Sequence, residues 1–435
     1  MDKMVEIWLP YGKTEVHVSV PLRYLMGTIE PAELKLPENP FETITSALDN
    51  LIGTENIQDL VNGKKSAAIA LDGTMAPHAA SVAASAIVWT LEQNGMSREN
   101  VSLIIGNGLR EHGNLDLLGA LQRAEPLGNV AIHEHSINSV DINKVGVTSS
   151  RTQVSLAQPF LEADLRIAVG DLRPDHFSGM KGAQSTVMPA LASREGLTRH
   201  REISFHGSVT LGIFEGNLAH LDQMEACKMA DLDVALNLVT DGWGRIVSAV
   251  AGGIEQSWKT AVERSGDLIQ LSSEADADII IVSAGGDLYD FNLFNAVWAL
   301  QGIASLVKKG ATIIFLAECT QGLGAAGLES LAQVDTLSEL RRRYELGARA
   351  VYAIKSTLRG NNEIILVSAL PTYLADPLGF KMERTANAAF QRVMDRRRNR
   401  RTLVVTHGAS SVFMPSKGGK NDKSSDHHSK VEKNQ

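Results

Sequence analysis

The sequence has little cysteine, few aromatic residues and no long apolar run. Its two cysteines, Cys227 and Cys319, are too few for a disulfide framework and do not have metal-knuckle spacing. No apolar stretch reaches the roughly 18 to 20 residues that span a bilayer, and Met1-Asp2-Lys3 is not followed by the apolar part of a signal peptide. The net charge of −8 disfavours nucleic-acid binding, because phosphate contacts need surplus Lys and Arg. We therefore expect a cytoplasmic protein that binds neither membranes nor nucleic acid.

Short runs of Val, Ile, Leu and Ala, each about the length of a buried strand, recur along the chain. They are Ala67–Leu71, Val101–Ile105, Leu165–Val169, Asp278–Ser283, Thr312–Ala317, Glu363–Ser368 and Leu403–Thr406. Helix-length stretches with apolar residues three and four apart lie between several of them, as at His78–Gln93, Leu293–Val307 and Leu328–Glu345. This alternation predicts an α/β fold with mainly parallel sheets and crossover helices.

The length of 435 residues predicts more than one domain, because one apolar core rarely grows past about 250 to 300 residues. We expect two α/β domains with a cleft between them: residues 1–265, ending after the helical stretch Ile254–Val262, and residues 266–415. Residues 416–435 are rich in Lys and Ser and are predicted to be a disordered tail. The basic run Arg396–Arg401 is interpreted as a solvated helix end.

Glycine-rich turns follow several of the predicted strands, where ligands of open α/β sheets bind. Gly106-Asn107-Gly108 lacks the third glycine of a dinucleotide-binding motif, so a nicotinamide cofactor is not expected. The segment Arg173–Ser185 gathers Asp, His, Lys and Arg directly after a strand and is a candidate active site. For any one glycine, or for His176 alone, a structural role in a turn or loop is the simpler interpretation.

Four separated segments carry a family resemblance: Glu162–Ile167, the loop Pro174–Pro189, Ser283–Leu300, and Ala317-Glu318-Cys319 with Gly322 and Gly324. In this order they resemble the nickel-dependent lactate racemase (LarA-like) family. The resemblance implies two α/β domains around a cleft and the racemisation or epimerisation of α-hydroxy acids. It also implies a nickel-pincer nucleotide tethered through a thioamide to a lysine, a histidine ligand to nickel, and two histidines that move the substrate's hydroxyl proton.

Several positions of this chain depart from the family pattern. Asp72 is kept, but Met75 stands where the family has an arginine, and Arg110, after Gly108, where it has a histidine base. Asp175 takes the place of the second histidine and Ser185 that of the tethering lysine.

Further departures affect the metal ligand and the second domain. Arg201 aligns with the nickel-binding histidine, and His200 is its neighbour. Phe294, Asn295 and Trp298 replace a Tyr-Gln pair and a lysine. A serine cannot form the thioamide, and neither arginine nor tryptophan moves a proton at neutral pH.

Three neighbouring side chains could restore the lost groups if their loops were shifted: His176, Lys181 and His200. Three independent displacements would be needed, and a misplacement of about 1 Å can cost on the order of 100-fold in rate. The standard nickel-pincer mechanism is therefore disfavoured.

Two hypotheses follow. In the first, the protein is a divergent hydroxy-acid isomerase. Its catalytic residues are then Asp72, Arg110, Asp175 and His176. The residues around an altered cofactor are Gly108, Lys181, Ser185, Asn295 and Trp298, and His200 is the metal ligand.

In the second hypothesis, the protein is a pseudoenzyme that binds a small anion, such as a hydroxy carboxylate or a phosphate, through Arg110, while Phe294 and Trp298 fill the cofactor volume. Trp298 favours the second hypothesis, although simple packing of its helix explains a tryptophan equally well.

Overall fold

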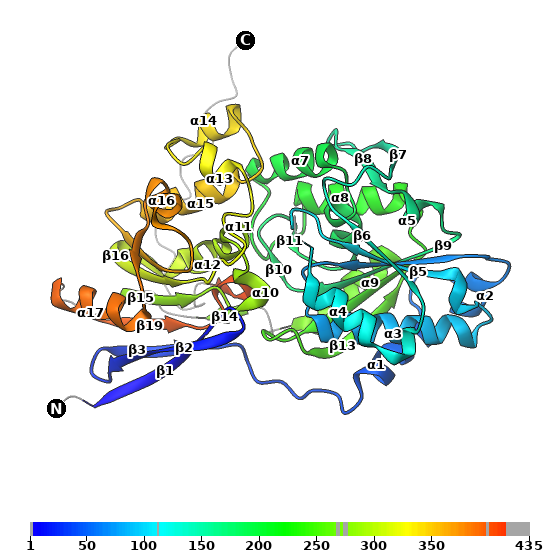
Figure 1. The fold of residues 1–435 in the computed structure, drawn as a ribbon, viewed down its shortest axis with the longest axis horizontal. Coiled ribbons are helices and arrows are strands. Elements are labelled where there is room, and N and C mark those ends of the chain that lie inside the picture. The colour runs from blue at the N-terminus through cyan, green and yellow to red at the C-terminus, as the bar shows by residue number, and fades with distance from the viewer. Residues whose placement is uncertain (1–2, 111–112, 267–269, 273–276, 397–399, 415–435) are drawn as a thin grey trace, which may run out of the picture.

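The computed structural model describes residues 3–110, 113–266, 270–272, 277–396 and 400–414. The predicted tail, residues 416–435, and residues 397–399 of the basic run lie outside this described part. Figure 1 shows two α/β lobes side by side, each built around its own sheet. We call them the N-terminal lobe and the C-terminal lobe.

The N-terminal lobe contains a six-stranded sheet in the order β13-β12-β9-β4-β5-β6. All neighbours are parallel except β12 and β13, which are antiparallel. The strands are β4 (Ala67–Asp72), β5 (Val101–Gly106), β6 (Ala131–His135), β9 (Leu165–Leu172), β12 (Val234–Thr240) and β13 (Ile246–Gly252). Because β4 and β9 are buried along nearly their whole length, they read in the sequence as continuous apolar runs.

Helices cover both faces of this sheet. On one face lie α1 (Pro40–Asp49), α3 (Pro77–Gln93) and α4 (Leu115–Arg123). On the other face lie α5 (Gln158–Glu162), α7 (Arg194–Glu202) and α8 (Leu218–Met229). A further helix, α9 (Ile254–Ser265), packs on β12 and β13. Local signals start several of these helices. In α1, Asn39 accepts hydrogen bonds from the amides of Phe41 and Glu42, and Pro40 occupies the first helical position.

The C-terminal lobe contains a second six-stranded sheet, in the order β18-β17-β16-β15-β19-β3, and all its neighbouring strands are parallel. Its strands are β3 (Leu25–Ile29), β15 (Ala277–Ser283), β16 (Val307–Leu316), β17 (Glu363–Val367), β18 (Lys381–Glu383) and β19 (Thr402–Val405). The core on one face includes α15 (Ala348–Leu358), and α17 (Ala386–Arg396) packs on the other.

The first strands of the chain belong to the C-terminal lobe. β3 pairs with β19, placing Ile29 beside Val405. The hairpin of β1 (Met4–Tyr11) and β2 (Thr14–Pro21) packs Leu9 and Val18 into the same apolar cluster as Phe390. The predicted N-terminal domain, residues 1–265, is therefore not one contiguous unit of the structure. Its edge strand β3 pairs with β19, more than 370 residues further along the chain. The change from the first sheet to the second otherwise falls between β13 and β15.

All seven predicted strands are present, and the predicted helix His78–Gln93 is α3. The other two predicted helices are interrupted. Residues 293–307 form α11 (Leu293–Ala296), α12 (Trp298–Gly302) and a 3-10 turn, and residues 328–345 contain α13 (Gly327–Ser330) and α14 (Leu337–Arg342). Thr336 caps α14 by accepting a hydrogen bond from Glu339, so a new helix begins there. Within the described ranges, no helix is long and apolar enough to cross a bilayer.

We predict that Gly170→Ala destabilises the N-terminal lobe, because a Cβ on Gly170 of β9 would lie 2.3 Å from the carbonyl carbon of Gly182. The expected loss in the free energy of unfolding is about 1 to 3 kcal/mol, as for other overpacked sites. Denaturant unfolding checks it. Gly27→Ala in β3 is the control, since a Cβ there meets nothing within 4 Å. Equal stability of the two variants would contradict the prediction.

Candidate functional site

A cavity lies between the lobes, beyond the carboxyl ends of β4, β5 and β9, and is closed on its other side by the segment from Leu288 to Trp298. This is where ligands bind in open α/β sheets. The volume open to the centre of a water molecule is about 140 Å³, so the cavity suits a small molecule. Its polar and charged lining residues are Asp72, Thr74, Asn107, Arg110, Arg173, Asp175, His176, Lys181, Ser185, Arg201, Gln223, Tyr289 and Asn295.

The turn after β4 places the first carboxylate. Asp72 ends the strand and accepts hydrogen bonds from the backbone amide of Thr74 at 2.8 Å and from its hydroxyl at 2.6 Å. Gly73 is required between them, since a Cβ there would lie 2.6 Å from Oδ1 of Asn107 in the turn after β5. The two strand ends can therefore approach only with glycine at this position.

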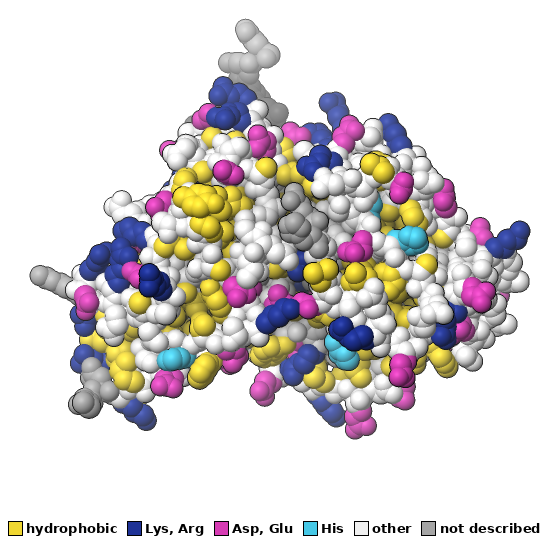
Figure 2. All heavy atoms as spheres, in the orientation of Figure 1, with side chains coloured by type: hydrophobic (Ala, Val, Ile, Leu, Met, Phe, Trp, Pro, Cys, Tyr) yellow, Lys and Arg dark blue, Asp and Glu magenta, His cyan; other side chains and the backbone are white. Residues whose placement is uncertain are grey.

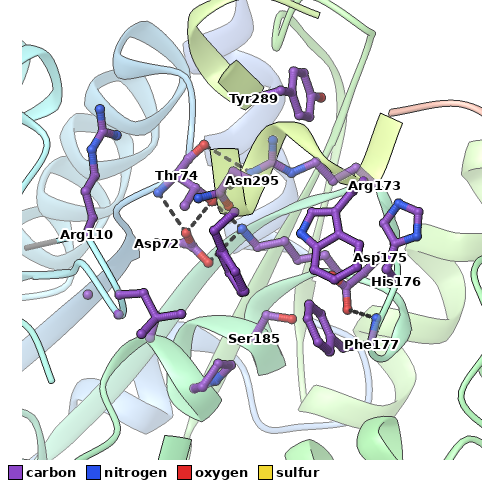
Figure 3. A pocket seen from close by; sticks show the side chains of 18 of the residues that line it. Asp72, Thr74, Arg110, Arg173, Asp175, His176, Phe177, Ser185, Tyr289 and Asn295 are labelled. Carbon is purple, nitrogen blue, oxygen red and sulfur yellow. Dashed lines mark hydrogen bonds and ion pairs between the residues drawn. The ribbon is translucent and has the colours of Figure 1, made fainter. Parts of the chain in front are cut away.

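Lys181 and Asp72 form a buried ion pair at the centre of the cavity, with 2.9 Å between Nζ and Oδ2. The ammonium also donates to the hydroxyl of Thr74 (Figure 3). Burial by itself raises the pKa of Asp72, but Lys181, the Thr74 donor and Arg173 more than offset it, so its pKa lies below the usual range. The Asp72 carboxylate is therefore already paired with a cation, the Lys181 ammonium.

Arg173 extends this network. Its Nε lies 3.1 Å from Oδ2 of Asp171, and its Nη2 donates to the carbonyl of Thr74 at 3.0 Å and to the hydroxyl at 2.8 Å. The guanidinium also lies over the ring of Tyr289, 5.3 Å from its centre, and so reaches from one lobe to the other. Because the two cations of this network each have an acid partner, the centre of the cavity is close to electrically balanced.

Asp175 is held in the turn that follows β9. Its Oδ2 accepts hydrogen bonds from the amides of Phe177 and Ser178 and from the Ser178 hydroxyl. Burial raises the pKa of Asp175, but Arg201 and the Ser178 donors outweigh this effect and bring the pKa below its usual range. This carboxylate supports the loop rather than offering a free base.

His176 is buried, with 4% of its surface exposed, and neither ring nitrogen has a hydrogen-bond partner. Its ring stacks on Trp298 with 5.0 Å between centroids. Burial is the main cause that lowers its pKa to about 3, and Arg349 acts in the same direction while Asp175 opposes it. His176 is therefore a neutral imidazole, and it makes no hydrogen bond with Asp175.

Two cations of the cavity have no acid partner among the described residues. Arg110 lies over the ring of Phe291, 4.1 Å from its centroid, and its Nη1 donates a long 3.4 Å bond to the carbonyl of Gly73, but its buried Nε has no partner. Arg201 lies over Phe177 at 3.7 Å, and its shielded Nε and Nη1 have no partner. In Figure 3, Arg110 and Phe177 lie on opposite sides of the Asp72 network.

His200 does not line the cavity. It is 1% exposed, its Nδ1 lies 2.7 Å from Oδ2 of Asp222, and its Nε2 faces the amide of Gln223 at 3.4 Å. Asp222 also accepts hydrogen bonds from the hydroxyls of Thr148 and Thr152. The prediction of a metal ligand at His200 does not agree with this geometry, because α7 turns the ring toward α8 and both ring nitrogens already face protein groups.

The other candidate residues from the sequence all line the cavity: Asp72, Gly108, Arg110, Asp175, His176, Lys181, Ser185, Asn295 and Trp298. Their proposed roles remain predictions. Ser185 has a buried hydroxyl without a partner, and Asn295 donates to Oδ1 of Asn292, which caps α11. Trp298 contacts His176, Phe177 and Phe294, so it fills the cavity wall and packs its helix at once.

Sequence reasoning gave no site role to Thr74, Tyr289 or Phe291, and it named Arg173 only as the first residue of the candidate active-site segment Arg173–Ser185. Thr74 and Arg173 directly follow predicted strands, so their place at a strand's carboxyl end was a usable signal. Tyr289 and Phe291 reach the site only because the two lobes meet there, and no local pattern indicates that contact. Arg201 was noted only for its position in the family pattern, and its lack of an acid partner became visible in the structure.

The fold and the cavity define a class: two-lobed α/β proteins with a charged cavity between two mainly parallel sheets. Within that class, residues 11–211 match the lactate racemase N-terminal domain and residues 272–413 match the lactate racemase C-terminal domain. The chain belongs to the lactate racemase family.

Curated relatives and solved structures agree with this assignment. The chain is 28% identical to a lactate racemase of Thermoanaerobacterium thermosaccharolyticum, over 74% of this chain and 77% of that protein. It is 26% identical to a lactate racemase of Lactiplantibacillus plantarum, over 77% and 80%. The lactate racemase apoprotein structure from T. thermosaccharolyticum superposes with a TM-score of 0.79 at 22% identity, covering 94% of this chain and 100% of that one. A Thermotoga maritima protein gives a TM-score of 0.65 at 14% identity, covering 88% and 100%.

The nickel-pincer nucleotide that the resemblance implies does not fit the side chains at this cavity. Ser185 cannot form a thioamide tether, and Lys181 is held in the ion pair with Asp72. The resemblance implies one histidine ligand to nickel, and at that position the cavity is lined by Arg201, while the neighbouring His200 faces Asp222 and Gln223. Cys227 and Cys319 are buried thiols outside the cavity lining, and burial raises the pKa of both.

We predict that His176 makes stability depend on pH. Because its folded-state pKa of about 3 lies below the ordinary 6.5, protonation favours the unfolded chain, and stability is lost as pH falls from about 6.5 toward 3. At pH 4.5 the expected loss from this group is about 2 to 3 kcal/mol relative to pH 7.

His176→Phe, which keeps a flat ring against Trp298, removes that part of the loss. Urea unfolding of both proteins at the two pH values measures it, because the remaining histidines are common to both. An identical pH dependence would show that His176 does not titrate with a lowered pKa.

Proposed function

We propose that the cleft binds a small α-hydroxy carboxylate and that the protein is a racemase or epimerase of such acids with an altered site. The observation that carries this proposal is the charge of the cavity. Four cations line the cavity, Arg110, Arg173, Lys181 and Arg201, against the lining carboxylates Asp72 and Asp175 and against Asp171, which pairs with Arg173, so the site keeps a surplus of positive charge. Over the face in Figure 2, by contrast, Lys, Arg, Asp and Glu side chains are interspersed.

Arg110 is the group best placed to receive the ligand's carboxylate. Lys181 and Arg173 already have acid partners, whereas Arg110 has none among the described residues and its Nε is free of hydrogen bonds. Its stacking on Phe291 keeps the planar guanidinium in one orientation, which suits a bidentate contact with a carboxylate. The curated relatives are named as lactate racemases, and lactate is a molecule of this class and size.

His176 is the group that can exchange a proton with the ligand's hydroxyl. It is neutral, and both of its nitrogens are unpartnered at the cavity. A neutral imidazole accepts at one nitrogen and donates at the other. A bound carboxylate nearby raises the pKa of His176 back toward its usual range and so makes it a better proton acceptor.

A second candidate function, binding without turnover, is favoured by the state of the other groups. Asp72 and Asp175 are both committed to protein donors, and Trp298 covers one face of His176. No step of the reaction is therefore assigned to either carboxylate. A racemisation assay with a binding measurement separates the two functions.

We expect Arg110→Met to weaken the binding of lactate by about 1.5 to 3 kcal/mol, roughly 10- to 100-fold, because a charge-assisted hydrogen bond is lost. Isothermal titration calorimetry on the full chain measures the change. Arg123→Met, at the exposed end of α4, is the control and is expected to bind as the unchanged protein does. Equal affinity of the two variants would remove Arg110 from the site.

Racemisation also breaks the Cα–H bond of the acid, and His176 exchanges only the hydroxyl proton, so the first candidate function requires a bound hydride acceptor that the described side chains do not supply. With such an acceptor, we expect enantiopure lactate or a larger α-hydroxy acid to lose optical rotation in the presence of the protein. His176→Phe should abolish this loss, since a phenyl ring cannot carry a proton, and should change affinity much less than turnover. Chiral chromatography follows the two enantiomers. Binding that depends on Arg110 without any racemisation would select the second candidate, a non-catalytic binder.

A further inference from the structure

We infer that the ligand of this cleft carries two anionic groups, one held by Arg110 and the other by Arg201, so that it is a hydroxy dicarboxylate or a phosphorylated hydroxy acid rather than a monocarboxylate. This inference rests on the proposed function and narrows its substrate class. It begins from the arrangement of charges along the cavity.

The cavity has a balanced centre and two cationic ends. At the centre, Lys181 is paired with Asp72, and Arg173 is paired with Asp171. Arg110, at one end, contacts Phe291 from the C-terminal lobe. At the other end, Arg201 contacts Phe177, which lies on the far side of the Asp72 network from Arg110 in Figure 3. The two unpaired guanidinium groups are therefore separated by a region that has no need of a counter-ion.

Arg201 is partly exposed, but two of its three guanidinium nitrogens are shielded from solvent. Its Nε and Nη1 are shielded from solvent and make no hydrogen bond to any described residue. A guanidinium withdrawn from water without a partner is costly, so such groups normally pair with an anion. Asp175 and, more weakly, Asp72 attract Arg201, but neither forms an ion pair with it, and Oδ2 of Asp175 accepts hydrogen bonds from Ser178 and Phe177. Two guanidinium nitrogens of Arg201 are therefore left without a hydrogen-bond acceptor among the described residues.

Two further side chains that line the cavity have polar atoms without a hydrogen-bond partner. The hydroxyl of Ser185 and both ring nitrogens of His176 are buried without hydrogen bonds, and both residues line the cavity with Arg201. The hydroxyl and one imidazole N–H can donate to an anion while the guanidinium supplies the charge. Unpartnered polar side chains that line a cavity indicate a ligand whose polar groups satisfy them.

Aromatic rings hold this end rigid. The guanidinium of Arg201 lies 3.7 Å from the centroid of Phe177, Phe177 meets Trp298 edge to face at 5.0 Å, and Trp298 stacks on His176. This row of rings keeps the guanidinium plane fixed, as the bidentate recognition of a carboxylate or phosphate requires. Trp298, which narrows the cleft, therefore also helps to build a second anion site.

The test compares lactate with malate, because malate differs from lactate by one added carboxylate. Calorimetric titration of the full chain is expected to give at least tenfold tighter binding of malate. In Arg201→Met the ratio of the malate affinity to the lactate affinity should fall to about one. In Arg110→Met the affinity for both acids should fall.

A third probe, the phosphate ester of glycerate, shows whether the second anionic group of the ligand is a carboxylate or a phosphate. If this ester binds more tightly than malate and Arg201→Met removes the difference, the second group is a phosphate.

Arg199→Met is the matched control. Arg199 lies on the same helix two positions earlier, pairs with Glu202, and does not line the cavity. It should leave all three affinities unchanged. If Arg201→Met does not fold, as judged by circular dichroism, Arg201→Lys takes its place, since it keeps the charge but loses the fork and should reduce the preference for malate severalfold.

Two results would overturn the inference in different ways. Equal binding of lactate, malate and the phosphate ester, weakened by Arg110→Met and indifferent to Arg201→Met, would reject the second anion site and leave the proposed function standing. No binding of any of the three acids would reject the proposed function itself, and with it this inference.

Discussion

The ion pair between Lys181 and Asp72 joins two loops that follow different strands, and the rest of the site is arranged around it. Asp72 closes β4, whereas Lys181 comes from the loop after β9. Charges at this depth are stable only when they are paired, so the two loops cannot separate without exposing or orphaning one of them. Arg173 hydrogen-bonds to Thr74 and also lies over the ring of Tyr289 in the other lobe. The buried ion pair therefore fixes the relative position of the loops that line this part of the cavity.

The position of the N-terminal hairpin has a related effect on the two lobes. Because β3 completes the C-terminal sheet, the chain starts in one lobe, crosses to the other and returns. The turn of the hairpin lies at the junction: the amide of Gly12 donates to Asp290, and Lys13 pairs with Asp116 of α4. The hairpin turn is thus anchored to Asp290 within the C-terminal lobe and reaches the N-terminal lobe through an exposed ion pair.

The departures from the family pattern form a consistent chemical change. Arg110 and Arg201 stand where the resemblance places histidines, and both are the cations without an acid partner in the described part of the chain. A guanidinium can neither ligate a metal nor transfer a proton at neutral pH, but it binds anions well. Ser185, at the position where the resemblance implies a tethering lysine, has a buried hydroxyl without a partner. His176 alone among the lining residues keeps an imidazole, and the stacking on Trp298 and the burial that hold it neutral define what it can do.

The α/β class and the seven predicted strands follow from apolar runs, which are local signals, while strand-end polar residues and the family resemblance together predicted nine of the residues that line the cavity. The sequence by itself could not determine that β3 pairs with β19, or that 293–307 breaks into short helices, since both depend on contacts far along the chain. His200 and Arg201 show the limit most clearly. They are neighbours in sequence, yet one ring turns into the N-terminal lobe toward Asp222 and the other side chain lines the cavity. Which side of a helix faces a site, and which charge lacks a partner, is decided only when the lobes pack together.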